Sequence, residues 1–132
     1  MVRNIIGFIV GYVVGSIVNF ALIMAGLALM PAGTDFSTPE GIAAAMAQMG
    51  AINYAVVFLA HALGAFVGAL VAGLIAASYR LPLALVIGVL FLFGGIYMAA
   101  TVDAPLWFEA LDLILAYIPM AWLGWRVSGG KS

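Results

Sequence analysis

Long apolar stretches separated by short polar segments form most of this chain. Four such runs occur, at about residues 5–30, 53–78, 83–100 and 106–125. Each run approaches or exceeds the roughly 20 residues that a helix needs to cross the hydrocarbon core of a bilayer. The last run is the least apolar, because it contains Glu109, Asp112 and Pro119. The pattern therefore predicts four transmembrane helices.

The first run begins shortly after Arg3, as the apolar core of a signal peptide follows a basic residue. Such a core has only about 7–15 residues. This run extends from Ile5 to Met30 without a charge, so we expect a helix that is retained.

A short helix is predicted between the first two runs, at about residues 38–50. The segment Ser37-Thr38-Pro39-Glu40 supplies a capping side chain, a first-turn proline and a glutamate. The apolar residues that follow share one helical face, and they are Ile42, Met46 and Met49. We therefore expect this helix to lie on the membrane surface.

Composition excludes several other classes of protein. Of the 132 residues, 67% are hydrophobic and 7% are charged, whereas a soluble domain carries about 25% charged residues. So few charged side chains cannot cover the surface of a soluble globule, which excludes a soluble enzyme. The chain has no cysteine and a net charge of −1. Disulfides, thiolate metal sites and a basic surface for nucleic acid are therefore excluded as well.

We predict an all-α polytopic membrane protein in which residues 1–132 form one domain embedded in the lipid bilayer. The domain is an antiparallel bundle of four transmembrane helices, with the short interfacial helix between helices 1 and 2. All basic residues fall on one side of this bundle, and they are Arg3, Arg80, Arg126 and Lys131. The positive-inside rule makes that side cytoplasmic. We therefore expect an inner-membrane location with both termini in the cytoplasm.

Small residues recur every four positions in the first two helices. The main positions are Gly7, Gly11 and Gly15 in helix 1, and Gly64 and Gly68 in helix 2. Such rows let helix backbones approach closely in a membrane, so we predict direct packing of helix 1 on helix 2. Two alternatives stay open: glycine is common in membrane helices, and one row could form the interface of a homo-oligomer.

Few polar side chains lie at membrane depth, where a charged group costs about 2.5–3.5 kcal/mol on insertion scales. At a rise of 1.5 Å per residue, Asn19, His61 and Asp112 lie about 15, 12 and 9 Å below the outer boundary. Tyr97 starts nearer to that boundary and reaches toward the depth of these three residues. Glu109 lies within one helical turn of the boundary. Helical phase points Asn19, His61 and Asp112 toward the bundle interior.

These residues predict a polar pocket that opens to the outside, built on His61 and Asp112, with Asn19, Tyr97 and Glu109 around them. A histidine and a carboxylate in a medium of low dielectric constant can take up and release a proton near neutral pH. The alternative is that His61 and Asp112 only hold the bundle together. A solvated carboxylate at the start of a helix is the ordinary explanation of Glu109.

Two residues of helix 4 affect the expected shape of this pocket. At 100° per residue, Tyr117 falls on the face opposite Asp112, so we leave it outside the predicted cluster. Pro119 predicts a kink that frees a backbone carbonyl near residue 115.

Methionines offer a second hypothesis for the outer half of the bundle. The residues expected near the outer surface, above His61, are Met30, Met46, Met49 and Met98. Thioethers with an imidazole would suit copper(I). Because methionine more often fills irregular apolar gaps, we predict no metal site and no cofactor.

The segment Ala104-Pro105-Leu106-Trp107-Phe108 is followed by Leu111-Asp112-Leu113 and by Ala116-Tyr117-Ile118-Pro119-Met120. In these residues the chain resembles short bacterial four-helix inner-membrane proteins known mainly as predicted proteins. The resemblance extends over helices 2 to 4. It implies the four-helix membrane fold and no particular activity.

Three functions remain after these arguments. The first is binding or passage of a small solute or a proton through the polar pocket, with assembly as a homo-oligomer. The second is a non-catalytic scaffold or accessory subunit whose glycine faces are its working surface. The third is a lipid-active membrane enzyme with His61 as general base oriented by Asp112. The sequence shows no nucleophile, oxyanion stabiliser or metal set, which counts against the enzyme. The polar residues that share one layer of this small bundle favour the first function.

Overall fold

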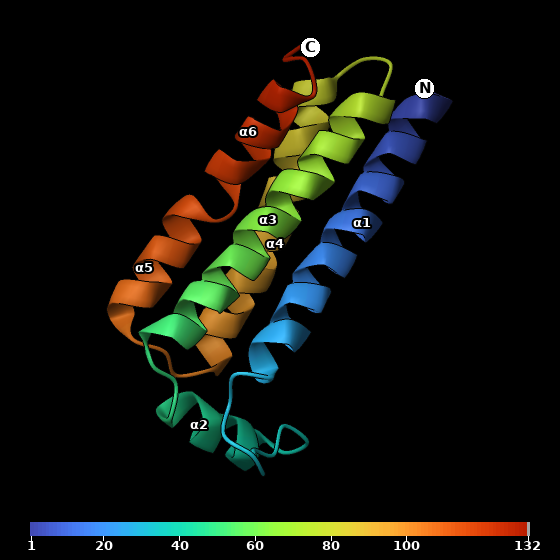
Figure 1. The fold of residues 1–132 in the computed structure, drawn as a ribbon. Helices are drawn as coiled ribbons and strands as arrows, with labels where there is room; N and C mark the ends of the chain where they lie inside the picture. The colour runs from blue at the N-terminus through green and yellow to red at the C-terminus, as the bar shows by residue number, and fades with distance from the viewer. Residues whose placement is uncertain (132) are drawn as a thin grey trace.

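Four apolar helical segments run along one another in the structure, which is a computed structural model describing residues 1–131 (Figure 1). The helices are α1 (Val2–Leu27), α2 (Pro39–Ala47), α3 (Ala51–Ile75), α4 (Arg80–Thr101), α5 (Leu106–Leu115) and α6 (Ile118–Val127). The long helices α1, α3 and α4 each supply one candidate membrane span, and α5 with α6 supplies the fourth. This confirms the all-α fold with four transmembrane segments, and it confirms the short helix between the first two.

Several helix ends differ by a few residues from the predicted ones. Helix α1 ends at Leu27 rather than near residue 30, because residues 28–30 continue only as single turns before Pro31. Helix α3 ends at Ile75, where Ala76 takes an extended conformation (ψ 142°). Helix α4 begins at Arg80, since its proline at position 82 fits within a first helical turn.

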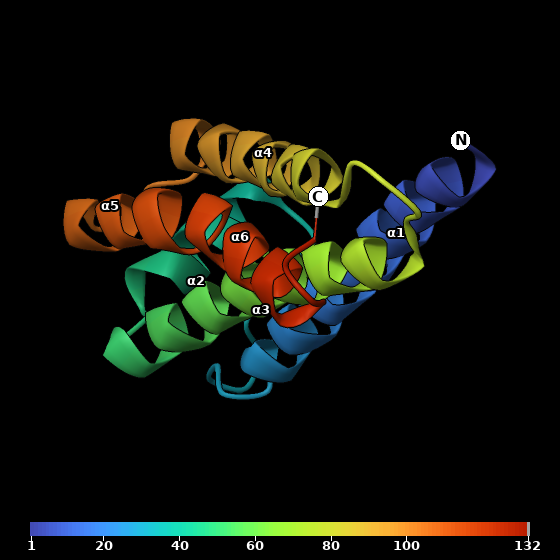
Figure 2. The ribbon, with the colours of Figure 1, turned by 90° about the horizontal axis from the view of Figure 1, so that it is seen from above.

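Helix α3 is the centre of the bundle, because its contacts with the other transmembrane segments are the most extensive, whereas α1 contacts only α3 and α4 (Figure 2). The α1–α3 contact is built on the predicted glycines. Gly7, Gly11 and Gly15 are buried on α1, and a Cβ added at Gly11 would lie 2.5 Å from the backbone oxygen of Gly68. The two backbones therefore touch where neither helix carries a side chain larger than a methyl group.

The fourth transmembrane segment is broken near its middle. Helix α5 ends at Leu115, and the next helix begins at Ile118, after Tyr117 has adopted φ −110° and ψ −76°. Pro119 is the second residue of α6, and it has no backbone N–H to donate to the carbonyl of Leu115. The proline therefore separates two short helices rather than only bending one.

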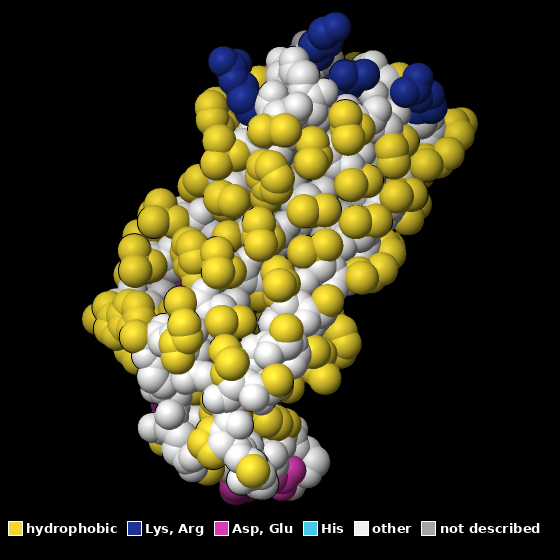
Figure 3. All heavy atoms as spheres, viewed as in Figure 1, with side chains coloured by type: hydrophobic (Ala, Val, Ile, Leu, Met, Phe, Trp, Pro, Cys, Tyr) yellow, Lys and Arg dark blue, Asp and Glu magenta, His cyan; other side chains and the backbone are white. Residues whose placement is uncertain are grey.

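The two ends of the bundle differ in charge. Arg3, Arg80, Arg126 and Lys131 lie at the end where both termini are found, which we call the basic end (Figures 1 and 3). Acidic side chains gather at the opposite end, which we call the α2 end (Figure 3). At the basic end, Asn4 accepts hydrogen bonds from the backbone N–H groups of Ala77 (3.0 Å) and Ser78 (3.1 Å), and this ties α1 to the α3–α4 turn.

Helix α2 covers the other end of the bundle (Figure 1). The Thr38 hydroxyl accepts a hydrogen bond from the N–H of Gly41 (3.0 Å), which caps the helix. In the loop before it, the hydroxyl and N–H of Ser37 donate to Asp35 and lower the pKa of that carboxyl. No other helix among residues 1–131 packs its backbone closely on α2. Side chains fill part of the space between α2 and the bundle, and the rest of that space stays open.

Candidate functional site

A cavity of about 300 Å³ lies between α2 and the adjoining parts of α1, α3, α4 and α5. We call it the His61 cavity. Most of its wall is apolar, and its few side chains with titratable or amide groups are Asn53, Tyr54, His61, Glu109 and Asp112. Its volume falls at the lower end of the range typical of small-molecule sites.

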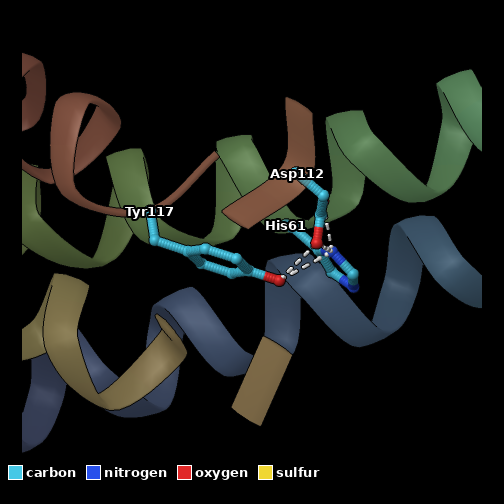
Figure 4. Close-up of polar contacts among 3 residues, drawn as sticks. All are labelled: His61, Asp112 and Tyr117. Atoms are coloured by element: carbon cyan, nitrogen blue, oxygen red, sulfur yellow. Dashed lines mark hydrogen bonds and ion pairs between the residues drawn. The ribbon is translucent and has the colours of Figure 1, made fainter. Parts of the chain in front are cut away.

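Three polar side chains meet beside this cavity (Figure 4), and two of them, His61 and Asp112, line it. The Nδ1 atom of His61 lies 2.8 Å from Oδ1 of Asp112 and 3.0 Å from Oδ2. The Tyr117 hydroxyl donates to Asp112 Oδ2 at 2.8 Å and lies 2.9 Å from the same His61 nitrogen. Asp112 and Tyr117 are buried, with 4% and 1% of their surfaces exposed. The predicted pairing of His61 with Asp112 is therefore present, with Tyr117 as a third member.

The arrangement assigns different roles to the two ring nitrogens of His61. A carboxylate can only accept hydrogen bonds, so with Asp112 ionised the nitrogen Nδ1 carries the hydrogen and Nε2 keeps a lone pair. Nε2 lies on the side of the ring away from Asp112 (Figure 4), and no hydrogen bond to it occurs within residues 1–131. Among residues 1–131, Asn19 Oδ1 is the one side-chain N or O atom that is both fully buried and without a partner. Since Nε2 also has no partner, it is not fully buried. Nε2 is thus free to accept a proton.

The exclusion of Tyr117 from the cluster was wrong. The prediction carried the 100° step through helix 4 without interruption, but the chain leaves the helix between Leu115 and Ile118. This break turns the Tyr117 ring back along α5, where it stacks near His61 (5.6 Å between ring centroids). Pro119 was the available signal, since a proline-induced break resets the phase of the residues around it.

The structure places the other predicted site residues in three different environments. Asn19 packs against Gly64 at the α1–α3 contact and does not line the His61 cavity. Tyr97 is 67% exposed and also lies outside that cavity. Glu109 lines the cavity one helical turn before Asp112. Of the three residues expected around the His61–Asp112 pair, only Glu109 shares its cavity.

A second, more open cavity of about 750 Å³ adjoins the first, and we call it the vestibule. Tyr97, Thr101 and Asp103 lie on its wall, together with residues of α2 and of the α4–α5 connection. It shares six residues with the His61 cavity: Ile42, Met46, Met49, Tyr54, Val102 and Ala104. The vestibule and the His61 cavity are therefore neighbours separated by these side chains.

The methionines expected near His61 line the His61 cavity, and they are Met30, Met46, Met49 and Met98. Within residues 1–131, no group of three or more His, Cys, Asp or Glu residues could hold a metal ion. These unbranched thioether side chains supply flexible apolar wall to the His61 cavity, and the absence of a copper(I) site there stays a prediction.

The fold and this site define the class of the chain, which is a multi-pass helical membrane protein with an apolar cavity that holds an ionisable cluster. No protein-family model, curated protein or solved structure matches the chain. Its function is therefore argued from the site.

The contribution of Tyr117 can be measured by replacing it with phenylalanine. The Tyr117→Phe variant loses one hydrogen bond to Asp112 and keeps the ring, so the free energy of unfolding in detergent should fall by about 0.5–1.5 kcal/mol. Tyr97→Phe is the matched control, because the Tyr97 side chain is mostly exposed and makes no hydrogen bond within residues 1–131. Equal stabilities of the two variants would show that the Tyr117 hydroxyl does not support the cluster.

Proposed function

We propose that this chain binds a small, mainly apolar solute in the His61 cavity and exchanges a proton at His61 when it does so. The observation that carries the proposal is the His61–Asp112–Tyr117 cluster, which lies within the transmembrane segments and borders an open cavity. Ionisable groups at membrane depth are costly and typically belong to ion paths, proton relays or ligand sites.

A purely structural role for the cluster explains less of its geometry. Interhelical hydrogen bonds in membranes contribute on average only about 0.6 kcal/mol each. A pair retained only for packing needs one contact between the helices, which His61 Nδ1 and Asp112 already provide. The second nitrogen of His61 has no hydrogen-bond partner within residues 1–131 and belongs to a residue that lines a cavity, as a proton-accepting group requires.

The distribution of charge supports an orientation for this activity. By the positive-inside rule the basic end faces the cytoplasm, so the His61 cavity and the vestibule face the opposite side. In an inner membrane that side is the periplasm. We propose this location and orientation together with the binding function.

The two other functions have less support from the structure. Gly7, Gly11 and Gly15 are occupied by contacts with α3, so they do not form a free surface for a scaffold or a homo-oligomer. A lipid-active enzyme that works through a covalent intermediate needs a nucleophile near the general base. No Ser, Thr or Cys of residues 1–131 lines the His61 cavity.

Access to the cavity can be tested with single cysteines, because the natural chain contains none. Val57 lines the cavity, whereas Leu59 on the same helix is 51% exposed on the outside of the bundle. In a bilayer, a Val57→Cys thiol that meets water should react with a small water-soluble thiosulfonate at least about tenfold faster than a lipid-facing Leu59→Cys thiol. Addition to one side of sealed vesicles, then to the other, tests the orientation.

Two results of this measurement would contradict the proposal. If the two thiols react at equal rates, the cavity does not admit solutes from water. If Val57→Cys in vesicles of known sidedness reacts only with reagent added on the cytoplasmic side, the proposed orientation is wrong. A folding control is available in each sample, since both variants must keep the thermal stability of the natural chain.

A further inference from the structure

We infer that the solute of the His61 cavity is a monovalent organic cation, a substituted ammonium group carrying apolar substituents. This inference rests on the proposed function and adds the chemical class of the ligand. It is carried by an unpaired carboxylate on an apolar wall, by the absence of opposing positive charge there, and by aromatic and thioether surfaces around it.

The unpaired carboxylate is that of Glu109. It lines the cavity and is partly buried, yet it takes part in no hydrogen bond or ion pair within residues 1–131. Asp112, one turn further along α5, has its oxygens occupied by His61 and Tyr117. The first turn of a helix favours a carboxylate, which explains a glutamate at this position but supplies its carboxylate with no hydrogen-bond partner within residues 1–131. A bound cation would supply the missing partner.

No lysine or arginine offsets this carboxylate nearby. Neither the His61 cavity nor the vestibule has a lysine or arginine on its described wall. The chain has four such residues, and all of them lie at the basic end (Figure 3). Because charges interact more strongly in a poorly solvated site than in water, the cavity attracts a cation and repels an anion.

The remaining wall indicates an organic rather than a small inorganic cation. Tyr54 and Phe108 both line the cavity, with 4.8 Å between their ring centroids, and aromatic faces attract ammonium groups that carry methyl substituents. The wall also contains four methionine side chains, which adapt to apolar groups of different shape. A strongly hydrated ion needs oxygen ligands that this wall does not provide in number.

The vestibule also favours cations and leads toward the His61 cavity. Asp103 lies on its wall, and exposed acidic residues gather at the same end of the bundle (Figure 3). Negative potential around an opening raises the local concentration of cations and speeds their entry. We therefore expect entry from the vestibule, past the side chains that the two cavities share.

The inference can be tested with two probes of nearly equal shape, benzyltrimethylammonium and its neutral carbon isostere neopentylbenzene. The chain has one histidine, so ¹⁵N-histidine labelling in lipid nanodiscs reports only on His61. We expect the cation to shift the imidazole signals at a concentration at least about tenfold lower than the neutral probe does. Glu109→Gln should weaken binding of the cation about tenfold and leave binding of the neutral probe unchanged.

Glu40→Gln is the matched control. It removes the same charge from the same end of the bundle, but Glu40 is exposed on α2 and lines neither cavity. Affinity for the cation should change by less than about twofold in this variant, since an exposed charge at a distance is screened.

The outcomes distinguish failure of the cationic ligand class from failure of the proposed binding function. Equal affinities for the two probes, or equal effects of Glu109→Gln and Glu40→Gln, would overturn the cationic class and leave a binding cavity for neutral solutes. Failure of both probes to shift the His61 signals would also overturn the cationic class. The reaction rate of Val57→Cys then decides separately whether the cavity admits solutes at all.

Discussion

Gly11→Leu should separate α1 from α3 and cause the largest loss of stability expected for this chain. A Cβ at Gly11 would lie 2.5 Å from the Gly68 backbone oxygen and 3.0 Å from the Ala72 nitrogen. Both obstacles are backbone atoms, which cannot move aside as a side chain does. Overpacking costs about 1–3 kcal/mol where neighbours can adjust. We therefore expect a loss above about 3 kcal/mol in the free energy of unfolding, measured in detergent.

Gly94→Leu is the control for this prediction. Gly94 also lies in the middle of a transmembrane helix, but a Cβ added there meets no atom within 4 Å. The leucine side chain would face lipid, so the stability should change by less than about 1 kcal/mol. If Gly11→Leu were as stable as Gly94→Leu, close α1–α3 packing would not hold this bundle together.

Asp112→Asn should reverse the roles of the two nitrogens of His61. The amide oxygen can still accept from the Tyr117 hydroxyl, which places the NH₂ group of the new side chain toward Nδ1. Nδ1 must then accept, so the hydrogen moves to Nε2 and the free nitrogen becomes a donor. We expect the dominant tautomer to change from Nδ1–H to Nε2–H, read from the ¹⁵N signals of this single histidine, while the bundle loses about 1 kcal/mol.

Asp112→Asn should abolish proton exchange at His61 although it costs the bundle little stability. With Nε2 protonated in the neutral ring, His61 no longer accepts a proton at the position that is free in the natural chain. Asp35→Asn is the control, because it makes the same change in a fully exposed loop residue whose partners are local. An unchanged tautomer in Asp112→Asn would mean that Asp112 does not orient His61, and the proton-exchange proposal would then fail.

The predicted pocket shows which side-chain positions helical phase alone can predict. His61 and Asp112 were paired from depth and phase, because each lies in an uninterrupted helix where both quantities follow from residue number. Tyr117 was assigned to the wrong face, because it lies in the two-residue break between α5 and α6. The sequence predicts that Tyr97 reaches toward the pocket, but the residue lines the vestibule instead and is 67% exposed. Phase is lost at a break, and side-chain reach depends on how a helix is rotated.

Asn19 illustrates a different limit of the sequence. Its depth and interior direction were predicted, and the residue does face α3. It is nevertheless absent from the cavity wall, because the close approach at Gly15 and Gly64 encloses its side chain between α1 and α3. The distance between two helices decides whether a polar side chain enters a cavity or an interface, and that distance results from the packing of both.

The amino-acid pattern alone predicts the membrane class of this protein, its four transmembrane segments, the separation of its charges and the pairing of His61 with Asp112. Each of these depends on hydrophobicity or spacing within single helices, which are local properties. The arrangement of the helices was needed to show that Tyr117 joins the pair, that Glu109 lines a cavity without a hydrogen-bond partner within residues 1–131, and that α2 covers a gap. These features arise where several helices meet around a proline break, and no single segment of the chain contains them.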